Sequence, residues 1–199
     1  MINKNIIKLS GRIVSEVVYS HSVFDEDFYT CVIEIPRLSD AKDLINLTFP
    51  KRMTEIIRQN EFYTITGQLR SYNKFYENKT SLILTVFVKT AVICNVCTCE
   101  NEIELTGYVC KEPIYRKTPY NRQICDLLVA VNRGFNKSDY IPCIAWGSSA
   151  FFSSTLKVGS HIKIVGRLQS REYDKVLDTG EVVKKTAFEV SIKCIEVLD

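Results

Sequence analysis

Long apolar runs and histidines are scarce in this chain, and each absence excludes a class of function. No stretch approaches the roughly 20 apolar residues of a membrane-spanning helix, and residues 1–5 lack the apolar run of an export signal. The two histidines, His21 and His161, accompany no recognisable Ser or Cys nucleophile motif. Glycine-rich phosphate-binding fingerprints are also missing. We therefore expect a cytoplasmic protein that is not an enzyme.

The eight cysteines predict reduced thiols rather than disulfides or a metal site. Most of them lie inside apolar, strand-like runs, and without an export signal a reducing compartment is expected. Cys94, Cys97 and Cys99 form the one metal-like constellation, but structural zinc usually takes two C-x-x-C pairs and the second pair is missing. We expect no metal and no other cofactor, with zinc at these three cysteines as the alternative.

The balance of charge identifies no partner. The net charge is +3, with 12 basic and 10 acidic side chains in residues 1–99 and 14 and 13 in residues 100–199. A chain this near neutrality neither requires nor excludes a nucleic-acid partner.

The main positive feature is an internal repeat. Ile6–Arg12 is similar to Ile103–Tyr108, and Thr64–Leu69 is similar to Lys163–Leu168. The paired glycines of these segments lie 96 and 99 residues apart, so the spacing is nearly constant along the chain. Such a repeat predicts two tandem copies of one small domain. We place the first domain at residues 1–95 and the second at residues 102–199, with a short polar linker between them.

Alternating apolar residues bounded by turn residues predict five strands in each copy. The expected strands are 5–18, 28–37, 43–50, 61–72 and 80–93 in the first copy, and 102–112, 122–132, 139–146, 160–173 and 184–197 in the second. A helical signal at 51–59 and at 147–156 falls between the third and fourth strands of each copy.

This element order predicts an all-β chain of two tandem OB-type five-stranded Greek-key barrels, each with one short helix after the third strand. A five-stranded sandwich is the alternative. Glycines in the first and fourth strands favour the barrel, because strongly coiled strands need residues without a Cβ at their bends.

Four sequence blocks in the second copy carry a family resemblance. They are Ala130–Arg133, Asp139–Gly147, Lys157–Ser160 and Val165–Tyr173. In order and spacing they resemble the bacterial single-stranded DNA-binding proteins, whose OB domains carry an AVNR-like strand end, an aromatic–Gly end to the third strand, a K-G-S turn and a G-R-L-x-x-R-x-aromatic fourth strand. The chain lacks the acidic C-terminal tail that is usual in that family.

The resemblance implies a set of residues that hold single-stranded DNA. Its base-stacking positions correspond to Phe135, Tyr140, Trp146 and Tyr173. Every base has a π-face, so aromatic rings along a groove bind single strands with little sequence preference, at about 1–3 kcal/mol per base. The candidate phosphate contacts among them are Arg116, Lys117, Arg122, Arg133, Lys137, Arg167 and Arg171. The alternative is that the aromatic residues, Trp146 above all, belong to the core.

The first copy departs from the family pattern. Phe49-Pro50 stands where the second copy has Trp146-Gly147, so the implied stacking residues are Phe49 and either Phe75 or Tyr76. The corresponding basic candidates are Arg37, Lys51, Arg52, Arg70 and Lys74. With fewer aromatic residues, the first copy is expected either to bind more weakly or to serve mainly in structure and pairing.

The resemblance implies a non-enzymatic protein that coats and protects single-stranded DNA in replication, repair or recombination. Family members bring four OB domains together, so two domains in one chain imply a homodimer. One alternative is an OB scaffold that binds a replication or primosomal protein, and another is an RNA-binding protein, because stacking platforms accept both polymers.

Overall fold

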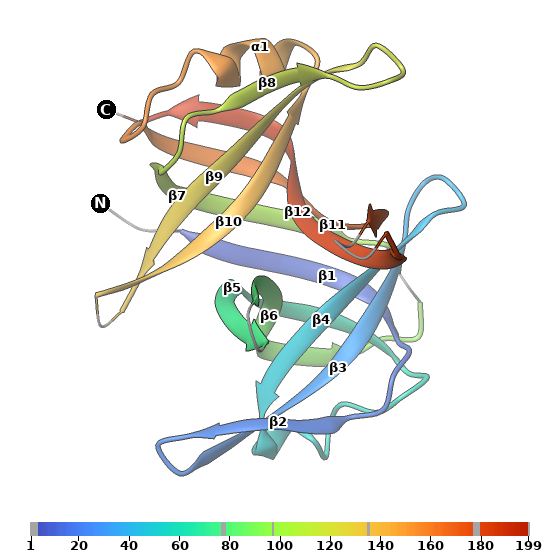
Figure 1. Cartoon of the computed structure of the whole chain (residues 1–199). Helices are drawn as coiled ribbons and strands as arrows, with labels where there is room; N and C mark the ends of the chain where they lie inside the picture. Colours follow the sequence, from blue (N-terminus) through green and yellow to red (C-terminus); the bar gives the residue numbers. More distant parts are fainter. Residues whose placement is uncertain (1–3, 77–78, 97, 135, 177–179, 199) are drawn as a thin grey trace.

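Strands make up most of the computed structural model, which describes residues 4–76, 79–96, 98–134, 136–176 and 180–198 (Figure 1). The first copy contains β1 (Asn5–Ile13), β2 (Val18–Val23), β3 (Glu26–Pro36), β4 (Lys42–Pro50), the 3₁₀ helix η1 (Lys51–Met53), β5 (Phe62–Tyr76) and β6 (Lys79–Ile93). The second contains β7 (Asn101–Val109), β8 (Ile114–Lys117), β9 (Gln123–Arg133), β10 (Lys137–Trp146), the helix α1 (Ser148–Ser154), β11 (His161–Val176) and β12 (Val182–Val197).

Each copy closes into a five-stranded barrel, which confirms the predicted all-β tandem OB fold. In the first copy β1 pairs with both β3 and β5, and β4 closes the circuit through a parallel pairing with β6. The second copy repeats this with β7, β9, β11, β12 and β10. β2 and β8 are short extra strands on the outer edges of β3 and β9, and the sequence pattern did not predict them.

A glycine is required where β7 crosses β9 to close the second barrel. A Cβ on Gly107 would lie 2.5 Å from the carbonyl oxygen of Ala130. Gly11 makes the same close approach to Glu34 in the first barrel. The repeated glycines of the sequence therefore stand where two backbones meet too closely for a side chain.

The predicted helix at 51–59 is wrong for most of its length. Only η1 forms there, and turns follow it. Tyr63 explains the difference, because its hydroxyl donates to the carbonyl of Ile56 at 2.7 Å and accepts from the backbone N–H of Arg58 at 3.1 Å. Those backbone groups thus bond to a side chain instead of to a helical partner. Among the described residues no helix is long and apolar enough to span a membrane.

The two barrels share one continuous sheet, because β1 pairs with β7 in antiparallel fashion. Ile7 pairs with Ile103 at the centre of this ladder, and these two residues are equivalent in the repeat. The two copies are therefore related by an approximate two-fold axis through this pair, as in an isologous dimer interface. Figure 1 shows the two strands side by side across the middle of the molecule.

Reciprocal buried carboxylates flank this ladder. The Asp139 side chain of the second copy is 0% exposed, forms ion pairs with Arg70 (3.0 Å) and Arg133 (3.4 Å), and accepts the backbone N–H of Ser71 at 2.8 Å. Its equivalent in the first copy, Asp43, bonds in the same way to the backbone of the second barrel. Each aspartate thus bonds to the backbone of the other barrel.

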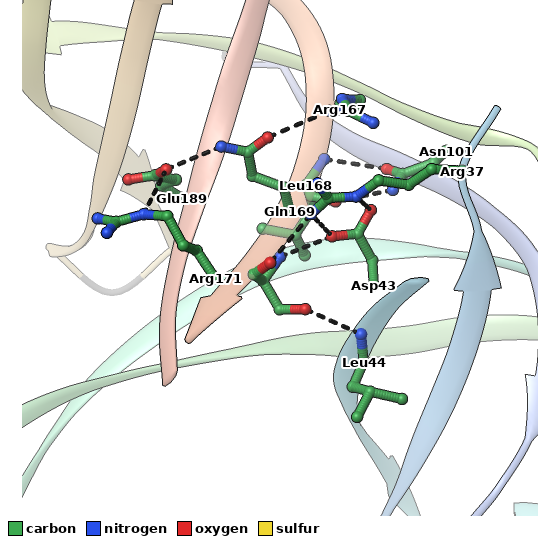
Figure 2. Close-up of polar contacts among 10 residues, drawn as sticks. Arg37, Asp43, Leu44, Asn101, Arg167, Leu168, Gln169, Arg171 and Glu189 are labelled. Carbon is green, nitrogen blue, oxygen red and sulfur yellow. Dashed lines mark hydrogen bonds and ion pairs between the residues drawn. The ribbon is translucent and has the colours of Figure 1, made fainter. Parts of the chain in front are cut away.

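Asp43 makes the same contacts except that it pairs with one arginine instead of two (Figure 2). It accepts Arg37 Nε at 2.9 Å and the backbone N–H of Ser170 at 2.8 Å. The Ser170 hydroxyl in turn accepts the backbone N–H of Leu44 at 3.0 Å. The Ser71 hydroxyl makes the equivalent bond on the other side of the seam. We name these two sets of contacts, centred on Asp43 and Asp139, the seam.

Replacing Asp139 by Ala should lower the free energy of unfolding by about 3–5 kcal/mol, since it leaves two arginines and a backbone N–H without their buried partner. Urea denaturation followed by circular dichroism measures the loss. Asp126→Ala is the matched control, because its ion pair with Arg116 is solvent-accessible and should be worth about 1 kcal/mol or less. Equal losses in the two variants would contradict the role given to the seam.

Candidate nucleic-acid interface

A basic groove of about 690 Å³ lies on the outer surface of the second copy. Its aromatic lining comes from Trp146, at the end of β10, and from Tyr120, in the turn before β9. Its basic lining consists of Arg37, Arg116, Arg122, Arg167 and Arg171. Four of these arginines belong to the second copy, whereas Arg37 reaches the groove from the first copy.

Trp146 points out of the barrel because of strand alternation. Its neighbour Ala145 is fully buried in the core, whereas the Trp146 side chain is 37% exposed. The indole Nε1 donates to the Ser191 hydroxyl at 3.2 Å, which fixes the edge of the ring against β12. The indole therefore lies partly open in the groove, as a base-stacking role requires.

The arginines of the groove differ in how far their charge is compensated. Arg116 pairs with Asp126 at 2.6 Å, and this hydrogen bond raises the pKa of the Arg116 guanidinium. Arg171 approaches Glu189 at 3.7 Å. Arg167 donates to the neutral Gln169 side chain, and Arg122 has no ion pair with any residue that the structure describes. The charges of Arg122 and Arg167 are thus available for phosphates.

Tyr140 and Tyr173 extend the surface beyond the groove. Tyr140 is 48% exposed and lies on the same face of β10 as Trp146, since their positions differ by six, an even number. Its backbone N–H bonds to Ser71, so it lies beside the seam. Tyr173 is partly exposed on β11, with the Arg171 guanidinium carbon 5.9 Å from its ring centroid.

The remaining predicted residues of the second copy lie in different settings. Arg133 is bound to Asp139 in the seam, which reduces its charge toward a strand outside. Lys117 on β8 and Lys137 on β10 are exposed. Phe135 falls outside the described residues, so its stacking role stays a prediction.

The assignment of Phe49 as a stacking residue is wrong. Its side chain is 0% exposed and belongs to the core of the first barrel. The strand register explains the error: Trp146 pairs with Ile124, and Pro50 pairs with the equivalent residue, Phe28. Pro50 is therefore the counterpart of Trp146, and a shift of one residue moves Phe49 to the inner face of its strand.

The other predicted residues of the first copy offer fewer open charges. Lys51 pairs with Asp27 at 3.6 Å and Arg52 pairs with Glu26 at 2.9 Å. Lys74 lies exposed on β5, at the position equivalent to Tyr173. The side chains of Phe75 and Tyr76 lie outside the described part of the chain, and their roles stay predictions.

An exchange of two residue types separates the copies further. The first copy has Gln68 and Arg70 where the second has Arg167 and Gln169. Arg70 forms an ion pair with Asp139 inside the seam, whereas Arg167 lines the groove. The same pair of side chains, in reversed order, thus supports the seam in one copy and the groove in the other.

Sequence reasoning missed Tyr120, Gln169, Glu189 and Ser191 in the groove, and it assigned Arg37 to the surface of the first copy. The exposed ring of Tyr120 in the polar turn Thr118–Asn121 was a signal that could have been used. No local sequence pattern predicts that Arg37 lies in the groove of the second copy, because its position there depends on how the two barrels dock.

Three of the described cysteines are buried thiols. Burial raises the pKa of Cys31 to about 12 and that of Cys125 to about 11, and it raises the pKa of Cys143 still further. Such thiols are protonated and unreactive at neutral pH. Within the described ranges, no group of three or more His, Cys, Asp or Glu side chains is placed to hold a metal ion. Cys97 lies outside them.

The fold and the groove define an OB-fold protein with a basic, aromatic surface groove, and comparison with known proteins identifies its family. Residues 100–198 match the sequence model of the "Single-strand binding protein family". The chain therefore belongs to that family through its second half.

Curated relatives match this chain over a segment shorter than one copy of the repeat. A "Single-stranded DNA-binding protein 3" of Streptococcus agalactiae is 33% identical over 81 residues, covering 37% of this chain and 59% of the relative. A "Single-stranded DNA-binding protein A" of Bacillus subtilis is 35% identical over 81 residues, covering 37% of this chain and 47% of the relative. The chain thus spans about half the length of these relatives.

The fold of the whole chain is shared with a solved structure. The wild-type single-stranded DNA-binding protein of Thermus aquaticus superposes with a TM-score of 0.80 at 15% identity, covering 100% of this chain and 95% of that one. At this identity the likeness concerns the fold, and it extends over both barrels.

Alanine substitutions should separate the surface ring from the buried one. Trp146→Ala should weaken binding of oligo-dT by about 1–3 kcal/mol with little change in stability, because the ring is partly exposed. Phe49→Ala should lower the free energy of unfolding by about 3–5 kcal/mol and leave the affinity of the folded protein unchanged. Denaturation by circular dichroism and titration by fluorescence anisotropy measure the two effects. Unfolding of Trp146→Ala, with full affinity in the folded fraction, would contradict the stacking role.

Proposed function

We propose that this protein binds and protects single-stranded DNA through the basic groove of its second copy. The observation that carries the proposal is the open indole of Trp146 among five arginines on the outer face of the barrel. Aromatic stacking with phosphate neutralisation is the combination that holds unpaired strands with little sequence preference. The protein then acts as a non-enzymatic coat in the cytoplasm, without a cofactor.

The two copies have different roles in binding DNA. The first copy has Pro50 in place of Trp146, and its Arg37 and Arg70 form ion pairs in the seam. It therefore binds DNA weakly by itself and serves mainly to support the second copy, to whose groove it supplies Arg37. The domains extend over residues 1–95 and 102–199, as the repeat suggests.

Fluorescence anisotropy of a labelled oligo-dT of about 35 nucleotides, long enough for two OB folds, tests the proposed function. Binding should be tight, should weaken with salt and should resist competition by duplex DNA. Each phosphate contact adds about 0.7 to the slope of log K against log salt, so Arg122→Ala should reduce that slope by about this amount. An RNA competitor of the same length tests the preference for DNA. Absence of binding at low salt would refute the proposal.

The full chain should form a homodimer that assembles four OB domains. Two barrels joined by the seam already form one pseudo-symmetric pair, and a second chain supplies the other pair. Light scattering after size-exclusion chromatography should therefore give twice the chain mass of 22.8 kDa, with and without bound DNA. A monomeric mass at micromolar concentration would contradict this assembly.

A further inference from the structure

One acidic residue lies in the basic groove. Glu189 on β12 is only 9% exposed and lines the groove together with Trp146 and four arginines of its own copy. A carboxylate at this position repels phosphate, so it lowers the affinity for a strand unless it also makes a favourable contact. Its hydrogen bonds indicate what that contact is.

A chain of polar side chains places the Glu189 carboxylate (Figure 2). Arg167 donates to Gln169 Oε1 at 3.3 Å, and Gln169 Nε2 donates to Glu189 Oε1 at 2.8 Å. Arg171 approaches the same oxygen, Oε1, at 3.7 Å. Gln169 and Arg171 thus both contact the same oxygen of the carboxylate.

The second carboxylate oxygen, Oε2, takes no part in these contacts. Oε2 of Glu189 accepts no hydrogen bond from any residue that the structure describes. It is also not among the described side-chain atoms that are both fully buried and without a partner. Oε2 is therefore an open acceptor that solvent, and hence a ligand, can reach.

A base stacked on Trp146 would lie within reach of this acceptor. The indole bonds to Ser191, and Glu189 lies two residues away on the same face of β12. Side chains at this spacing are about 7 Å apart. The edge of a base that lies over the indole and points toward β12 therefore meets the Glu189 carboxylate.

The bases differ in what they present to an acceptor. Cytosine carries an exocyclic N4 amino group, which is the donor that Glu and Asp side chains recognise. Thymine carries a carbonyl oxygen at that position, and its N3–H lies between two carbonyl oxygens that repel a carboxylate. Given the proposed single-strand binding, we infer that Glu189 makes this groove favour bases with an exocyclic amino group over thymine and uracil. The groove thus has one selective position within a binding mode that otherwise has little sequence preference.

The first copy has no carboxylate at the position equivalent to Glu189. The counterpart of Glu189 is Thr85, since Val86 and Val190 occupy equivalent positions opposite Leu69 and Leu168. The Thr85 hydroxyl bonds to that of Thr48 at 2.8 Å. Base selection therefore belongs to the second copy alone.

The test compares oligo-dC with oligo-dU of equal length, because these bases differ only at N3 and at the 4-position and both lack the thymine methyl group. At mildly alkaline pH the full-length protein should bind oligo-dC about tenfold more tightly, the factor expected for one hydrogen bond to a charged group. Glu189→Gln, whose amide can both donate and accept, should bring the two affinities within about twofold, mainly through tighter binding of oligo-dU.

Glu172→Gln is the matched control. Glu172 is exposed on the opposite face of β11 and carries the same charge, so this variant should strengthen binding of both oligonucleotides equally and leave their ratio unchanged. A change in the ratio that is as large in this control as in Glu189→Gln would show a general charge effect and would overturn the inference.

A modified base tests the same contact in the wild-type protein and does not depend on whether a variant folds. Oligo-dC with both N4 hydrogens replaced by methyl groups should lose its advantage over oligo-dU. Equal affinity for oligo-dC and oligo-dU in the wild-type protein, or an unchanged ratio in Glu189→Gln, would overturn the inference and leave the single-strand function intact. Failure to bind any of these oligonucleotides would instead refute the proposed function.

Discussion

The buried carboxylates of the seam are the constraint on which the rest of the structure depends. Asp43 and Asp139 each bond to an arginine and to the backbone of the opposite barrel, so neither charge is left uncompensated. With the β1–β7 ladder between them, they fix the angle and the register at which the two barrels meet. The position of Arg37 beside the groove of the second copy follows from that docking.

Symmetry at the seam coexists with asymmetry at the grooves. Where the copies touch, most equivalent residues make equivalent bonds across an approximate two-fold axis. Arg70 is the exception, because it pairs with Asp139 while its counterpart Gln169 bonds to Glu189. Away from the axis the copies differ more. There Trp146 is matched by Pro50, and Arg122 is matched by Glu26. Duplication therefore left one copy with the open cations and the exposed ring, and the other with paired charges.

Errors in the sequence-based predictions occurred where a neighbouring element decides the outcome. The segment after β4 has a helical pattern, but the Tyr63 hydroxyl takes its backbone groups. Phe49 was aligned with Trp146 by its order in the chain, but pairing with β3 moves it to the inner face. Arg70 was predicted as a phosphate contact and is instead bound mainly to Asp139 in the seam.

The sequence by itself determined the duplication, the all-β barrel of each copy and the aromatic and basic residue types of the second copy. These follow from periodicity and spacing, which depend on neighbours along the chain. Only the tertiary structure decided which rings face outward, which arginines keep their charge open and that Glu189 lies among them. Burial and ion pairing depend on residues that are distant in sequence, and a strand pattern does not specify which of them will meet.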